Sequence, residues 1–191
     1  PASFYDLLNA GKASVALDFR ASDDRRRLAT LVESADIVVE SSRPRALEQL
    51  GLDAARHVRE RPGATWVSLT GHGRRAPGRD WIAFGDDAAI AAGLSAVLHQ
   101  ATDDWLICGD AIADPLTGLH AALAGWASWR AGGGKLVALS LEQTVRHCIT
   151  ATAPPDNDYR ARLQRWQAYL ESEGIAARGP TRRAGSESST R

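Results

Sequence analysis

The sequence lacks several features that would each define a class of protein. It contains no methionine, only the two cysteines Cys108 and Cys148, and no apolar stretch of membrane-spanning length. Two cysteines cannot build a disulfide framework, and the absence of a CxxC or cysteine–histidine cluster predicts no zinc or other metal site. Because a membrane helix needs about 20 apolar residues and no signal peptide is visible, we expect a cytoplasmic protein without a membrane partner.

The chain also lacks an excess of either charge. Lys and Arg together number 23, as do Asp and Glu, so the formal net charge is zero. A general nucleic-acid binder needs a clear basic excess, and we therefore expect no nucleic-acid partner. The 191 residues suffice for one domain with a core and a small appendage. Because the sequence begins at Pro1 without a methionine, we expect the first segment of a larger fold to be missing.

Short apolar runs alternate with helical patterns along most of the chain. Predicted strands cover residues 14–19, 37–40, 65–70 and 136–140, with a short extended piece at 105–108. Predicted helices cover residues 23–32, 46–50, 54–61, 81–98, 115–130 and 141–147, with Ser22 and Asp53 as caps. This alternation is typical of an α/β domain with a Rossmann-like, largely parallel sheet and flanking helices.

The alternation ends at the proline-containing segment 153–155, and the C-terminal part differs in composition. Residues 159–173 show the apolar periodicity of one amphipathic helix. The sequence from Arg178 is rich in Arg, Gly, Ser and Thr, which is typical of a mobile terminus. We therefore predict an α/β domain over residues 1–150, a linker and amphipathic helix over 151–177, and a mobile tail over 178–191.

One junction combines a carboxylate with the start of an apolar helix. In the run Ile112-Ala113-Asp114-Pro115, the aspartate stands directly before the predicted helix 115–130. Asp is a favoured N-cap, and Pro is favoured one residue later because its missing N–H costs nothing there. The positive end of the helix and its unpaired N–H groups favour an ionised carboxylate. The pattern leaves two interpretations open, a helix cap and a nucleophile held ionised.

Other candidate groups have plainer interpretations. Asp110 is the nearest rival carboxylate, and its position outside the helix is typical of a turn residue. The run 132–135 follows a helix and precedes a strand, which is the wrong order for a phosphate-binding loop, so we interpret it as a helix stop and turn. His72 either faces a ligand or is a solvated loop residue, and His120 is interpreted as a packed or surface histidine.

Five segments, taken in their order along the chain, resemble one protein family. They are Gly11–Asp18, Ala35–Pro44, Val67–Gly73, Ala113–His120 and Gly133–Glu142. Their order and spacing resemble the class III CoA-transferases, the CaiB/BaiF family, which includes formyl-CoA and carnitine-type CoA-transferases and α-methylacyl-CoA racemases. The resemblance covers about residues 5–150.

The resemblance implies a nucleophile and a CoA site. In the family, the aspartate of the Ala-Asp-x-x-(Ser/Thr)-Gly run is the nucleophile, which implies this role for Asp114; it must be ionised at neutral pH, which needs no unusual pKa. The implied CoA site uses the end of the first predicted strand, the loop after the strand 37–40, and the segment before the alanine-rich helix. Its residues are Leu17, Asp18, Phe19, Arg20, Ser41, Ser42, Arg43, Ile82, Ala83, Phe84 and Gly85.

The resemblance also implies an activity and partners. It implies transfer of CoA from an acyl-CoA to a small carboxylic acid through an aspartyl-CoA thioester, with CoA and acyl-CoA as substrates and no permanently bound cofactor. The racemase branch uses a histidine just ahead of the alanine-rich helix, where this chain has Phe84 or Gly85, and this favours transferase over racemase. Because family members form interlocked dimers, we expect a homodimer or a partner chain that completes the fold.

Some features of the family differ in this chain. Ser41-Ser42 stand where the family usually has Asn-Phe, which removes an aromatic surface that would pack on adenine. By comparison with the family, we expect its first βα unit to be missing before Pro1, and its small second domain and glycine loop to be missing after Thr150. These departures leave a second function open, a non-catalytic remnant that acts as a binding or interaction module.

Overall fold

A parallel β-sheet forms the centre of the molecule. The computed structural model describes residues 2–175, and within them the sheet contains β1 (Ile37–Glu40), β2 (Thr65–Thr70) and β3 (Lys135–Ser140), in the order β1-β2-β3. The two pairings are both parallel, with Val38 opposite Trp66 and Trp66 opposite Leu136. The predicted α/β class with a parallel sheet is thus confirmed, whereas the tail predicted at 178–191 lies outside the described residues.

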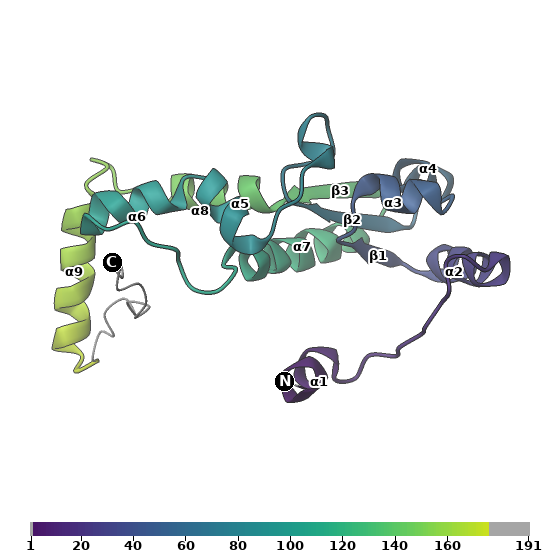
Figure 1. Ribbon diagram of the computed structural model, residues 1–191, viewed down its shortest axis with the longest axis horizontal. Helices are drawn as coiled ribbons and strands as arrows, with labels where there is room; N and C mark the ends of the chain where they lie inside the picture. The colour runs from purple at the N-terminus through teal and green to yellow at the C-terminus, as the bar shows by residue number, and fades with distance from the viewer. Residues whose placement is uncertain (1, 176–191) are drawn as a thin grey trace, which may run out of the picture.

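Helices lead into, connect and follow the strands. They are α1 (Ala2–Asn9), α2 (Ser22–Ser34), α3 (Pro44–Gln49), α4 (Ala54–Glu60), α5 (Gly85–Ala91), α6 (Leu94–Thr102), α7 (Ala113–Arg130), α8 (Leu141–Thr152) and α9 (Tyr159–Ser172), with a 3₁₀ turn η1 at Gly78–Asp80. Helix α9 packs against α6 at the end of the molecule opposite β1 (Figure 1). None of the helices within residues 2–175 is both long and apolar enough to span a bilayer.

Helices cover both faces of the sheet because successive strand side chains point to opposite sides. One face is covered by α7, which runs beside the sheet (Figure 1). There Val67 meets Gly125 of α7, where an added Cβ would lie only 3.0 Å from the Val67 Cγ2. Thr65 points to the same face, and its Oγ1 lies 2.8 Å from the buried Oγ of Ser128 on α7. On the other face, Trp66 packs with Ala54 and Val58 of α4.

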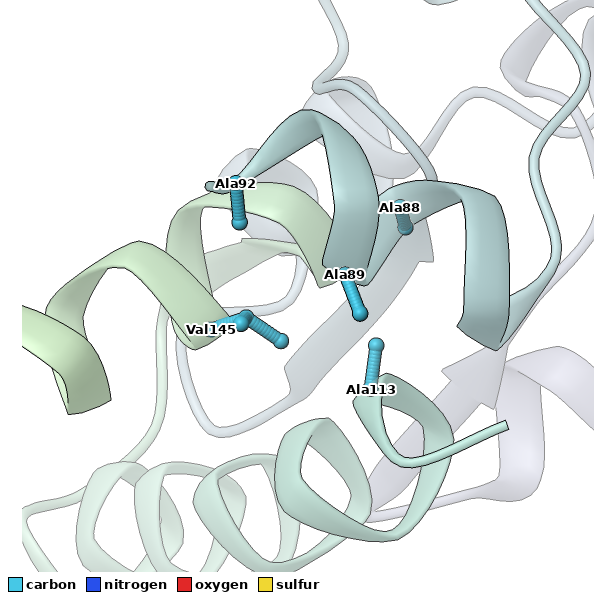
Figure 2. Close-up of a cluster of buried hydrophobic side chains, with 5 residues drawn as sticks. All are labelled: Ala88, Ala89, Ala92, Ala113 and Val145. Carbon is cyan, nitrogen blue, oxygen red and sulfur yellow. The ribbon is translucent and has the colours of Figure 1, made fainter. Parts of the chain in front are cut away.

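A second apolar cluster joins α5, α7 and α8 and is made of small side chains. Its buried members are Ala88, Ala89, Ala92, Ala113 and Val145 (Figure 2). Because alanine side chains are short, the helix backbones approach one another closely. The cluster therefore brings the first turn of α7 beside α5.

The strand predicted at 14–19 is wrong. This segment is an extended connection between α1 and α2 that lies apart from the sheet, and Val15 and Phe19 are 55% and 50% exposed (Figure 1). A strand needs a neighbour that pairs with its N–H and C=O groups, and none of the described strands lies beside this segment.

The single helix predicted at 81–98 is also wrong. Gly93 takes a left-handed conformation with φ +95°, and it separates α5 from α6. The segment 105–108, predicted as a short extended piece, has neither helix nor strand assigned and is not part of the described sheet. The last helix of the predicted domain, expected at 141–147, continues to Thr152.

Helix caps test the local sequence signals. The predicted Asp53 cap is confirmed, because its Oδ1 accepts a 3.0 Å hydrogen bond from the Arg56 amide. The predicted Ser22 cap is wrong by one residue, because Ser22 is already helical and Ala21 occupies the cap position. The strand predicted at 65–70 has the same bounds as β2.

Candidate active site

Asp114 lies inside the first turn of α7 rather than at its cap. The helix begins at Ala113 and its cap position is Ile112, so the predicted N-cap role of Asp114 is wrong. Ala111, two residues before the helix begins, adopts a left-handed conformation with φ 52°, and its carbonyl accepts a 2.9 Å hydrogen bond from the Asp114 amide. Pro115 then lies in the first turn, where a missing N–H leaves no intrahelical bond unmade.

The surroundings of Asp114 disfavour its charged form. Asp114 as a residue is exposed, but partial desolvation of its carboxyl is the main cause that raises its pKa above the usual value, and the negative charges of Asp86 and Asp87 raise the pKa further. The Gly85 amide, which faces the carboxylate, acts in the opposite direction. The desolvation and the two neighbouring carboxylates thus act against the Asp114 charge more strongly than the Gly85 amide favours it.

The start of α5 forms one wall beside Asp114. Gly85 is buried against the segment that precedes α7, and a Cβ added to it would lie 2.5 Å from the Ala111 carbonyl oxygen. The Asp86 Oδ1 accepts a 2.8 Å hydrogen bond from the Ala111 amide. The Asp87 Oδ1 accepts from the amides of Phe84 at 2.5 Å and Ala88 at 3.1 Å, which caps α5.

Two of the three predicted CoA segments come together around a cavity of about 160 Å³. Residues 41–43 form one side, residues 82–84 form another, and Leu69–Gly71 closes the cavity at the end of β2. Arg79 and Trp81 complete the lining from the loop after β2. The cavity thus lies at the carboxyl ends of parallel strands, where α/β sheets usually bind ligands.

The third predicted segment does not reach this cavity. Leu17, Asp18, Phe19 and Arg20 belong to the connection between α1 and α2 and are absent from the cavity lining. Asp18 instead accepts hydrogen bonds from the Arg20 side chain and amide, which lower the pKa of its carboxyl. Asp114 is also absent from that lining, although the predicted residue Gly85 connects the cavity segment to it.

A buried carboxylate supports the cavity loops and was not predicted. Glu40 ends β1 and is 8% exposed; its Oε1 accepts from Ser68 at 2.7 Å and from Arg74 at 2.9 Å, and its Oε2 accepts from Ser42 at 3.3 Å. The network joins two strand ends to the loops that follow them. The sequence carried one signal for this network, namely that a charged residue, Glu40, ends an apolar strand. Because the ends of adjacent parallel strands meet at one edge of the sheet, its side chain lies near the loops that follow the neighbouring strand.

His72 is a part-buried histidine with a partner, which makes the solvated-loop interpretation wrong. Its Nδ1 lies 2.7 Å from Glu142 Oε2, and Arg146 donates to Glu142 Oε1 at 2.6 Å. The hydrogen bond with His72 is the main cause that lowers the pKa of the Glu142 carboxyl, and Arg146 lowers it further. His120 packs on its own helix, with Nδ1 2.8 Å from the Leu116 carbonyl oxygen.

Among residues 2–175 no group of three or more His, Cys, Asp or Glu side chains is arranged to hold a metal ion.

Comparison with known proteins identifies a family and several relatives. The model of CoA-transferase family III matches residues 1–167. The acyl-CoA transferase of Fusarium pseudograminearum is 30% identical over 78% of this chain and 33% of its own length. The succinyl-CoA–D-citramalate CoA-transferase of Chloroflexus aurantiacus is 26% identical over 79% of this chain and 39% of its own length.

Solved structures show the same fold. A CaiB/BaiF family protein from Brucella suis matches with a TM-score of 0.63 at 24% identity, covering 88% of this chain and 42% of that chain. The hypothetical protein Rv3272 from Mycobacterium tuberculosis matches with a TM-score of 0.62 at 21% identity, covering 86% of this chain and 44% of that chain. The chain spans between 33% and 39% of the length of the two curated relatives named above.

Proposed function

Because the chain belongs to CoA-transferase family III, we propose that it transfers CoA from an acyl-CoA to a carboxylic acid, with Asp114 as the nucleophile. One observation carries the proposal. Asp114 stands in the first turn of α7 with the Gly85 amide facing its carboxylate, and Gly85 directly follows the cavity segment 82–84. A carboxylate and a ligand cavity are thereby connected by a single stretch of chain.

The proposed reaction consists of two matched acyl exchanges. The Asp114 carboxylate attacks the thioester carbonyl of the donor, which forms a mixed anhydride and releases CoA thiolate. The thiolate attacks the Asp114 carbonyl, giving an aspartyl-CoA thioester and the donor carboxylate. The acceptor carboxylate then attacks this thioester and forms a second anhydride with release of thiolate. Attack of the thiolate on the acceptor acyl carbonyl yields the new acyl-CoA and restores Asp114.

The backbone amides near Asp114 determine which group stabilises the developing oxyanion. Pro115 has no N–H, and the amides of Asp114 and Leu116 already donate to the carbonyls of Ala111 and Ile112. The helix end therefore offers fewer donors than its sequence indicates. The Gly85 amide faces the carboxylate, and we assign it the role of oxyanion donor.

The cavity has the chemistry to hold part of a CoA molecule. Arg43 and Arg79 contribute cationic side chains to its lining, and guanidinium groups bind phosphate oxygens well. Trp81 and Phe84 line the same cavity as Ser41 and Ser42, so they supply aromatic surface where the family's usual Phe is replaced. At about 160 Å³ the cavity holds one portion of the ligand rather than the whole.

A second candidate function is CoA binding without transfer. It is favoured by the absence of Asp114 from the cavity lining and by the separation of residues 17–20 from the other two segments. A binding module of this kind needs the cavity loops and their Glu40 support but no nucleophile. The two functions differ in whether a covalent product forms on Asp114.

The experiment that tests the proposal detects that covalent product. The chain is incubated with succinyl-CoA or formyl-CoA, digested, and analysed by mass spectrometry for CoA attached to the peptide that contains Asp114. We expect the adduct in the native chain and in the Asp110→Asn control, whose carboxylate lies in an exposed turn, and no adduct in Asp114→Asn. Calorimetry should show CoA binding to all three proteins.

Each other outcome decides against one or both functions. Transfer that persists in Asp114→Asn shows that another group is the nucleophile. CoA binding without an adduct in the native chain leaves only the binding module. A native chain that binds no CoA contradicts both functions.

A further inference from the structure

The segment that leads into α7 is held by a side chain from α5. Asp86 is half-buried, and its Oδ1 accepts a hydrogen bond of 2.8 Å from the Ala111 amide. The two residues are 25 positions apart in the sequence, so this bond fixes the approach of two separate elements. It is made three residues before the proposed nucleophile.

Ala111 needs such support because of its backbone conformation. Its φ of 52° lies in the left-handed region, which is unfavourable for a residue with a Cβ and persists only when neighbours hold it. Its amide is held by Asp86, and its carbonyl accepts from the Asp114 amide at 2.9 Å. One peptide segment therefore links the Asp86 side chain to the Asp114 backbone.

Packing leaves this corner little freedom. A Cβ at Gly85 would lie 2.5 Å from the Ala111 carbonyl oxygen, so α5 and the segment before α7 are already in contact. Ala88, Ala89 and Ala113 belong to the buried alanine cluster, in which the side chains of Ala89 and Ala113 point toward each other (Figure 2). The direction in which α7 starts thus depends on contacts with α5.

We propose that Asp86 is a positioning residue for the transfer reaction, holding the Ala111 amide and thereby fixing the direction in which α7 presents Asp114. This inference rests on the proposed function of Asp114 and adds a second residue to it. Asp86 acts through the backbone of residue 111 and does not need to touch the substrate. What matters for this role is that Asp86 places an oxygen acceptor at hydrogen-bond distance from the Ala111 amide, not that the side chain is charged.

The two effects of Asp86 on Asp114 can be separated by substitution. Among the described residues, the charged groups that act on Asp114 are Asp86 and Asp87, and both raise the pKa of its carboxyl. Asp86→Asn keeps an oxygen acceptor and removes the charge. Asp86→Glu keeps the charge and displaces the acceptor, and Asp86→Ala removes both.

The first measurement is the rate at which the Asp114–CoA adduct forms from succinyl-CoA, followed over a range of pH. We expect Asp86→Ala to lower the maximal rate by about 10- to 100-fold with little change in KM, which is the cost of a misplaced reacting group. Asp86→Asn should stay within a few-fold of the native rate, with its acidic limb moved to lower pH because a neighbouring charge is gone. Asp110→Asn should match the native chain in both respects.

The second measurement reports the position of Ala111 directly. Hydrogen exchange of the Ala111 amide should be faster in Asp86→Ala than in the native chain, and unchanged in Asp110→Asn and Asp86→Asn. Should Asp86→Ala fail to fold, as judged by circular dichroism, Asp86→Glu carries the test. We expect it to exchange faster and react more slowly although its charge is kept.

Distinct outcomes contradict the inference and the proposed function. A native adduct rate in both Asp86→Ala and Asp86→Glu overturns the inference and leaves the role of Asp114 intact. A slower reaction with unchanged exchange at Ala111 also overturns it, because the effect then follows another route. A native chain that forms no adduct overturns the proposed function and the inference together.

Discussion

The two apolar clusters of the molecule differ in the size of their side chains. Where the sheet meets α4, Trp66 packs against Ala54 and Val58 and is the one large side chain among the buried members of the cluster. Where α5, α7 and α8 meet, the buried cluster is made of alanines and one valine, Val145. A large side chain stabilises by the area that it buries, whereas small ones allow helix backbones to come close. The tryptophan cluster therefore secures the sheet, and the alanine cluster sets the position of Asp114.

Burial also acts differently on the ionisable group beside each cluster. His57 lies in edge-to-face contact with Trp66, at 5.3 Å between ring centres, and burial is the main cause that lowers the pKa of its imidazole. Asp114 follows the buried Ala113, and burial is the main cause that raises the pKa of its carboxyl. Both groups are pushed toward their neutral forms, so the pH dependence of stability has opposite signs in the two regions.

The largest expected effect comes from truncating the tryptophan cluster. Trp66→Ala should lower the free energy of unfolding by about 3–5 kcal/mol, because it removes a buried aromatic side chain and leaves a cavity. Chemical denaturation followed by circular dichroism measures this loss. Truncation of Trp166, which is exposed on α9, provides a matched control and should change stability little.

The role of ring volume at position 66 can be checked with Trp66→Phe. The indole Nε1 is buried and has no hydrogen-bond partner among residues 2–175, so phenylalanine removes volume and also an unsatisfied donor. We expect a smaller loss than in Trp66→Ala. Native stability in Trp66→Ala would show that the sheet does not depend on this cluster.

Enlarging a residue of the alanine cluster should have the next largest effect. Ala113 is 0% exposed, so Ala113→Leu forces α7 away from α5 and should destabilise the protein by about 1–3 kcal/mol. Because Asp114 is the next residue, the rate of adduct formation should fall while CoA binding at the cavity is kept. Denaturation, adduct mass spectrometry and calorimetry measure the three quantities.

The control for this change is Ala127→Leu on the exposed face of the same helix. It adds the same atoms without entering the cluster, and we expect near-native stability and reaction rate. A native reaction rate in Ala113→Leu would contradict the view that the close packing of this cluster positions Asp114.

The elements that the sequence predicted well are those whose signals are local. The strand 65–70 is rich in β-branched and aromatic residues and has turn residues at both ends, and the cap at Asp53 depends on atoms within one helical turn. The run at 14–19 carries a similar strand pattern but has no described strand beside it, so the pattern alone was misleading. The break at Gly93 was hidden because the alanines on either side favour helix.

The candidate site was predictable where a resemblance named its segments. Segments 41–43 and 82–84 line one cavity, although composition alone gave no reason to pair them. The contacts of Glu40 with Arg74 and of Asp86 with Ala111 join residues far apart in the sequence. Such contacts depend on how strands and helices are placed in space, which no local pattern encodes. The left-handed conformation of Ala111 was hidden for the same reason.

The smallest expected effect separates the two regions by pH. A carboxyl whose pKa is raised on folding contributes stability below its unfolded pKa and loses it as the pH rises through the folded value. Asp114→Asn removes this loss, so we expect its melting temperature to equal that of the native chain near pH 3.5 and to exceed it at pH 7. The gain should be on the order of a degree, since Asp114 is exposed and water screens its charge.

His57 gives the same experiment an arm of opposite sign. The pKa of His57 is lower in the folded protein than in the unfolded chain, so its contribution to stability is present above the unfolded pKa and is lost as the pH falls through the folded value. His57→Gln should therefore lose less melting temperature on acidification than the native chain. Asp110→Asn, which removes an exposed carboxylate, should follow the native profile throughout. If Asp114→Asn were instead less stable than the native chain at pH 7, the helix end would be stabilising the Asp114 charge more than burial and its acidic neighbours disfavour it. Asp114 would then be an ordinary first-turn aspartate. The two clusters would differ in the size of their side chains but not in the sign of the pH dependence of the group beside them.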